Sequence, residues 1–194
     1  FFGHQRFGFA RSNYEKVLKF LARNKKARSN KERFLVSVFQ AICFNYWLSE
    51  RLAQNLAPEP MVGDVFLGSP FGQRPFLAES FEESQERISQ GALSIAGPLV
   101  GAKMFSATTD ALAFESNLWA QMGIRPDFFK AHPALQKGAR RPAFVRLLEA
   151  DWASENKEMT LQFDLPKGAY ATVVLQHLLP GMVRDFALPQ HQIL

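Results

Sequence analysis

The chain has 194 residues, of which 47% are hydrophobic and 21% charged, and its formal net charge is +5. This balance excludes a disordered or low-complexity protein and is typical of one large globular domain or two small ones. A single cysteine, Cys43, excludes an intramolecular disulfide and indicates a reducing, intracellular compartment. The longest apolar stretch, 34–48, contains polar residues and is too short to cross a bilayer, so we expect no membrane partner.

Helical patterns dominate the first third of the sequence. Ser12 followed by Glu15 is a capping box, which predicts a helix from residue 12 into the basic run 23–28. Ser29 and Glu32 repeat this pattern and open a longer helix to about residue 56, ahead of two prolines. Apolar residues lie on several sides of this second helix, so we expect it to be largely buried.

Short extended segments and turns follow the two helices. Strand-like pieces over 65–67 and 76–78 lie between glycines and prolines, and Ser80 with Glu83 predicts a short helix that ends before residue 91. The remaining elements, in chain order, are an irregular loop over 97–103, a helix over 109–122, a loop containing Arg140 and Arg141, strands over 144–152 and 158–165, and a helix over 169–179. This order predicts the α+β class.

Motifs for common enzyme chemistry are absent from the sequence. The four histidines are far apart and no zinc or EF-hand spacing occurs, so we expect no metal. Walker, dinucleotide-binding and nucleophile-elbow patterns are also missing. We therefore expect no cofactor.

Positive charge is concentrated at the amino-terminal end of the chain. Residues 1–34 carry ten Lys or Arg side chains against two Glu, whereas the remaining residues carry 13 basic and 16 acidic side chains. Such a field is typical of proteins that bind nucleic acid. A solvated basic face with no partner explains the charge equally well, and a protein partner or an acidic membrane surface is a weaker alternative.

Aromatic residues alternate with arginines over residues 1–11, which read Phe-Phe-Gly-His-Gln-Arg-Phe-Gly-Phe-Ala-Arg. Aromatic rings stack on unpaired bases and guanidinium groups bind phosphate, so this composition suits RNA. The competing interpretation is structural: Phe7 and Phe9 would lie in the core, and Arg6 would pair with an acid inside the fold.

The opening segment Phe1-Phe2-Gly3-His4-Gln5-Arg6-Phe7-Gly8 resembles the Asn-Tyr/Phe-Phe-Gly-x-Gln-Arg-Phe-Gly signature of the tRNA pseudouridine synthase D family. Later segments resemble further landmarks of that family in the same order: 33–41 with Phe44-Asn45, 63–65, 113–115, 138–141 and 165–173. The resemblance implies a pseudouridine synthase catalytic fold built from residues 1–25 and 146–180, interrupted by a family-specific mixed α/β insertion domain over 26–145. Residues 181–194 would form a tail.

The resemblance also implies a function. Members of the family are isomerases that convert a uridine of tRNA, typically at position thirteen, to pseudouridine in the cytoplasm and without a cofactor. Phe2 matches an aromatic residue expected to stack on the target uracil. The polar residues that we expect to contact the RNA are Gln5, Arg6, Arg11, Arg23, Lys25, Lys26 and Arg28. Arg140 and Arg141 could contact either RNA or neighbouring acids.

The sequence departs from the family at the catalytic aspartate. In the family this residue lies in a Gly-x-Lys-Asp motif ahead of the opening signature, and neither the motif nor the leading Asn of the signature is present here. We therefore expect the nucleophile upstream of Phe1, in a longer protein, and no activity from this chain alone. From their contexts, Asp64 is expected in a turn, Asp110 at a helix cap and Asp164 at a strand end. The alternative function is a non-catalytic RNA-binding module on the same scaffold.

Overall fold

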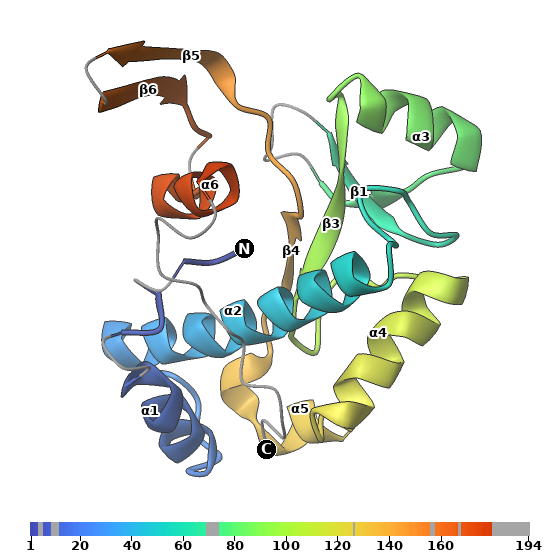
Figure 1. Cartoon of the computed structure of the whole chain (residues 1–194). Helices are drawn as coiled ribbons and strands as arrows, with labels where there is room; N and C mark the ends of the chain where they lie inside the picture. The colour runs from blue at the N-terminus through green and yellow to red at the C-terminus, as the bar shows by residue number, and fades with distance from the viewer. Residues whose placement is uncertain are drawn as a thin grey trace.

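The computed structural model describes residues 1–3, 6–8, 12–68, 74–125, 127–155, 158–166 and 168–179. Within these ranges, helices pack on a four-stranded antiparallel sheet with strand order β2-β1-β3-β4, and a separate two-stranded sheet pairs β5 with β6 (Figure 1). This mixture of helix and antiparallel sheet is the predicted α+β class. The predicted tail over 181–194, and the expected RNA contacts Gln5 and Arg11, lie outside the described residues.

Two helices form the first layer. Helix α1, Ser12–Leu21, buries three apolar residues against α2, Asn30–Ala53. The capping box predicted for α2 is confirmed, because Ser29 Oγ accepts from Glu32 N at 3.2 Å and Glu32 Oε2 accepts from Ser29 N at 3.0 Å. Ser12 itself is the first residue of α1, so it lies within the first turn rather than ahead of it. The predicted burial of α2 is also confirmed, since eleven of its residues are buried.

The sheet and its flanking helices follow in chain order. The elements are β1 (Val65–Gly68), β2 (Phe76–Leu77), α3 (Phe81–Ser89), β3 (Leu93–Leu99), α4 (Thr109–Gln121), α5 (Phe128–Ala131), the short 3-10 helix η3 (Pro133–Leu135) and β4 (Ala139–Pro142). The helices predicted over 81–90 and 109–122 and the short strands near 65 and 76 are therefore confirmed. Asp110 lies in the first turn of α4, where Thr108 is the N-cap residue, so the cap prediction for Asp110 is wrong.

Two predicted loops are partly strand, because residues 97–99 belong to β3 and residues 139–142 form β4. Gly97 and Pro98 suggested an irregular segment, but they continue β3 and pair with Arg141 and Arg140 of β4. The pairing of β3 with β1 covers only Leu93–Ile95, so Pro98 lies where β3 has a strand neighbour on one side. A proline, which lacks an amide hydrogen, is tolerated at such an edge.

The faces of β3 pack against different elements because successive side chains alternate across a strand. Leu93 and Ile95 share a core cluster with Phe44 and Trp47 of α2, whereas Ala96 packs with residues that include Ala107 and Ala111. Gly97 lies on the α2 side, where an added Cβ would come within 2.6 Å of both Phe44 and Trp47. This glycine therefore allows α2 to cross the sheet closely.

The carboxy-terminal elements are a hairpin and a helix. Strands β5, Leu148–Glu155, and β6, Glu158–Asp164, pair only with one another among the described residues, and α6 spans Ala171–Leu178. The predicted strand over 144–152 thus begins four residues later, while Asp164 ends β6 as expected. Among the described helices, none is both long enough and apolar enough to cross a membrane. The domain division at residues 26 and 146 stays a prediction.

Candidate RNA-binding site around Phe2

The backbone of Phe2 is fixed by a buried side chain of α2. Phe2 N donates to Asn45 Oδ1 at 2.7 Å, and Asn45 Nδ2 donates to Phe2 O at 2.9 Å. Asn45 is 4% exposed, so this pair of hydrogen bonds is shielded from water. The side-chain amide thus bonds both the N–H and the C=O of Phe2, as the backbone of a neighbouring strand would. This contact sets the position of Phe2 relative to α2.

Aromatic side chains surround the half-buried Phe2 ring. It meets Phe44 edge-on with ring centroids 5.5 Å apart, and Tyr170, which precedes α6, at 6.1 Å. The neighbouring Phe1 ring stacks on His177 of α6 at 6.0 Å. An added Cβ on Gly3 would lie 3.3 Å from Val173, so the opening segment passes close to α6. In Figure 1 the amino terminus accordingly lies between α6 and α2.

Arg141 covers one face of the Phe2 ring. Its Cζ lies 3.8 Å from the ring centroid of Phe2 and 5.0 Å from that of Phe44, which is cation–π geometry. Its Nη2 donates to Gly168 O at 3.0 Å, ahead of α6. Burial lowers the pKa of Arg141 to about 10, and the charge of Arg6 acts in the same direction. The guanidinium is therefore still a cation at neutral pH.

Arg6 approaches the same ring from the other end of the opening segment. Its Cζ lies 5.4 Å from the ring centroid of Phe2 and 5.6 Å from that of Phe34, and Nη1 donates to Ser37 Oγ at 3.2 Å. The structural interpretation expected an acid partner for Arg6, and the ion pairs among the described residues do not include this side chain. Phe7 does pack against the core cluster of α1 and α2, as that interpretation expected.

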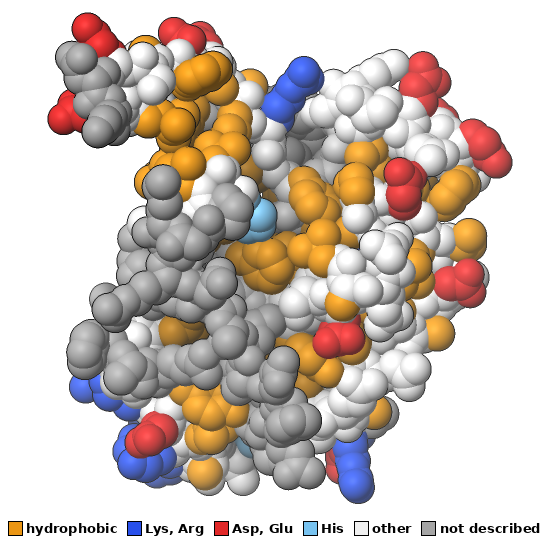
Figure 2. Space-filling view, viewed as in Figure 1, with side chains coloured by type: hydrophobic (Ala, Val, Ile, Leu, Met, Phe, Trp, Pro, Cys, Tyr) orange, Lys and Arg blue, Asp and Glu red, His pale blue; other side chains and the backbone are white. Residues whose placement is uncertain are grey.

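The basic run lies in the loop between α1 and α2. Arg23, Lys25, Lys26 and Arg28 are all exposed there. Figure 2 shows Lys and Arg side chains gathered at the lower left, in the region that α1 occupies in Figure 1. Its exposed positive charge makes this loop accessible to a large polyanion.

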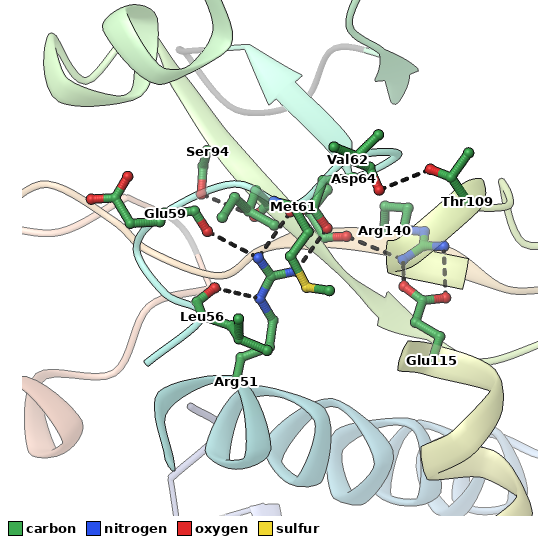
Figure 3. Close-up of polar contacts among 12 residues, drawn as sticks. Arg51, Leu56, Glu59, Met61, Val62, Asp64, Ser94, Thr109, Glu115 and Arg140 are labelled. Atoms are coloured by element: carbon green, nitrogen blue, oxygen red, sulfur yellow. Dashed lines mark hydrogen bonds and ion pairs between the residues drawn. The ribbon is translucent and has the colours of Figure 1, made fainter. Parts of the chain in front are cut away.

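Two buried ion pairs, drawn in Figure 3, hold the sheet to the helices. Arg51 of α2 binds Asp64 through Nη1–Oδ1 at 2.7 Å and Nη2–Oδ2 at 2.9 Å, and Asp64 also accepts from Met61 N. Arg140 binds both carboxylate oxygens of Glu115 on α4. Asp64 does lie in a turn, as predicted, but its main contact is this ion pair.

Adjacent arginines of β4 therefore have different roles. Because side chains alternate along a strand, Arg140 points to Glu115 and Arg141 points to Phe2. Of the two alternatives left open for Arg140, RNA or a neighbouring acid, the structure shows the acid. The sequence interpretation missed Glu115 and Asn45 as positioning residues. An acid directly after the apolar stretch 111–114, and an amide within the otherwise apolar stretch 41–48, were the available signals. In the described part of the chain no group of three potential metal ligands comes together.

Comparison with known proteins places this arrangement in a family. A family model described as tRNA pseudouridine synthase D (TruD) matches residues 24–178. The chain is 35% identical to a tRNA pseudouridine synthase D of Anaeromyxobacter sp. over 92% of its length and 52% of the relative, and 34% identical to one of Thermus thermophilus, covering 49% of it. A crystal structure of a putative tRNA pseudouridine synthase D from Methanosarcina mazei superposes with a TM-score of 0.63 at 21% identity, over 87% of this chain and 44% of that one. The chain thus spans about half the length of these relatives.

Proposed function

We propose the function of this chain from its family, since it belongs to the tRNA pseudouridine synthase D family. The protein that carries it would act in the cytoplasm as an isomerase on a uridine of tRNA, at position thirteen by family resemblance. In that reaction the bond between N1 of uracil and the ribose breaks, and a bond from C5 of the base to the same ribose carbon replaces it. The C5 hydrogen leaves as a proton and N1 takes up a proton, so the product is an isomer of the substrate and neither an oxidant nor a reductant is required.

The surroundings of Phe2 carry this proposal. A pyrimidine that has left its stack needs a rigid ring in place of the bases that flanked it. Asn45 fixes the backbone of Phe2, and Arg141 occupies one face of the ring at 3.8 Å. We expect the target uracil to stack on the opposite face. The nucleophilic aspartate would come from polypeptide outside this chain.

Release of tritium from tRNA labelled at C5 of uridine tests the proposal on the full-length protein. Phe2→Ala should lower kcat/KM by about tenfold to a hundredfold, because stacking contributes about 1–3 kcal/mol per base. Phe81→Ala, which removes an exposed ring from α3, is the matched control and should change kcat/KM less than about twofold. Binding of tRNA by the wild type without any release would overturn the catalytic proposal and favour the RNA-binding module.

The exposed basic loop should bind phosphates of the RNA. Reversing the charge of Lys25 and Lys26 to Glu should weaken tRNA binding and reduce the slope of log K against log salt by about 0.9 for each phosphate that the loop no longer neutralises. The double variant Arg74→Glu, Arg87→Glu, which reverses two exposed arginines outside the loop, controls for the equal change in net charge. An unchanged slope in the Lys25 and Lys26 double variant, measured by filter binding from about 50 to 200 mM salt, would refute the assignment of this loop.

A further inference from the structure

Three buried polar atoms without a hydrogen-bond partner gather around the opening segment. Among the described residues these atoms are Arg6 Nε, Arg141 Nη1 and Thr172 Oγ1. Both guanidinium groups lie against the Phe2 ring, and Thr172 Oγ1 is 3.4 Å from the position of a Cβ added to the next residue, Gly3. Buried donors are normally paired, so three unpaired ones in one place indicate a partner outside the described residues.

The electrostatics of this place favour an anion. The ion pairs of the described residues use Lys19, Arg51, Arg87 and Arg140, and neither Arg6 nor Arg141 has a carboxylate partner there. Two partly buried cations near one ring repel each other, and desolvation already lowers the pKa of Arg141. A group with a full negative charge relieves both penalties, whereas a neutral carbonyl group offers only a hydrogen bond.

The orientation of Arg141 selects the kind of anion. The flat face of the guanidinium is taken by Phe2, and Nη2 is taken by Gly168 O. The free Nη1 donor lies in the guanidinium plane, which is the direction from which guanidinium groups bind the oxygens of phosphate or carboxylate. We propose that Arg141, assisted by Arg6, binds a phosphate of the RNA strand directly beside the nucleotide that stacks on Phe2. This inference rests on the proposed function, because it takes RNA as the ligand.

A double-mutant cycle between the protein and one RNA phosphate tests the proposal. The full-length protein binds a tRNA stem-loop whose linkage on the 5′ or 3′ side of the target uridine is either a phosphate or a neutral methylphosphonate, with a 2′-deoxy sugar in both. The wild type should bind one of the neutral RNAs at least about tenfold more weakly. Arg141→Met should bind the natural linkage as weakly as the wild type binds the neutral one, with less than about twofold further loss on neutralisation.

Arg146→Met is the matched control, because this exposed arginine follows on the same segment and should retain the full sensitivity to the neutral linkage. Arg141→Lys covers the case in which the Met variant does not fold: it keeps the charge but not the planar fork, so its sensitivity should fall between those of the wild type and the Met variant.

The proposal would be overturned if neutralising either linkage weakened binding by the same factor in Arg141→Met as in the wild type. That result would indicate that a protein carboxylate pairs with Arg141. A wild type that does not bind the RNA at all would overturn the proposed function together with this inference. A wild type that binds the RNA and releases tritium while the cycle is additive would overturn only the inference.

Discussion

Asp64→Ala is expected to lower the free energy of unfolding by about 3–5 kcal/mol, the usual cost of removing one partner from a buried ion pair. Arg51 is 1% exposed and would keep its hydrogen bonds to Leu56 O and Glu59 O, but it would lose its only ion-pair partner among the described residues. The guanidinium would then be buried without an ion-pair partner among the described residues, and this uncompensated charge is the physical reason for the loss.

Urea denaturation of the full-length protein measures this loss. Glu83→Ala is the control, because it removes an acid from the exposed Glu83–Arg87 pair of α3 and should cost less than about 1 kcal/mol. Equal losses in the two variants would show that Arg51 and Asp64 are not shielded from water in solution.

Arg140→Met is expected to cost a similar amount at neutral pH but to recover on acidification. In the native protein burial raises the pKa of Glu115, and the hydrogen bonds from Arg140 counteract that effect. Without Arg140 the folded-state pKa rises further above the unfolded value of about 4.5. The folded variant then binds more protons than the unfolded chain, so its stability is retained below about pH 4.5 and falls as the pH rises through the folded-state pKa.

The measurement is the difference in unfolding free energy between Arg140→Met and the wild type at several pH values. A difference of about 3–5 kcal/mol near pH 7 should shrink as the pH falls toward 4.5. Arg140→Met, Glu115→Leu provides an internal check, since it removes both charges and should be less dependent on pH. A deficit that does not change with pH would mean that Glu115 reaches solvent once Arg140 is gone.

Elements with local signals could be predicted from the sequence, and elements defined by distant partners could not. Ser29 and Glu32 are three residues apart and specify the start of α2 through their own backbone. By contrast, Gly97 and Pro98 are strand residues only because β4 pairs with them. Their local preference is for a turn, and antiparallel pairing with a segment far along the chain overrides it.

The candidate site shows the same division. The resemblance to a family pointed to Phe2, but its support by Asn45 joins residues 43 positions apart and left no local pattern. The choice between Arg140 and Arg141 also depends on which face of β4 each side chain occupies, and that requires the register of β4 against β3. Sequence patterns alone did not identify β4 as a strand.

A one-residue slip of β4 against β3 would turn every side chain of β4 to the opposite face. Only one of the two arginines would then occupy a position that the other now holds, and Ala139 or Pro142 would take the second position. Either the acid on α4 or the aromatic cluster would thus lose its guanidinium, so both contacts depend on a single alignment of β4. Gln40 contributes to that alignment, since its amide nitrogen donates to Val100 O and Lys137 O, each at 3.0 Å, and joins the end of β3 to the start of β4.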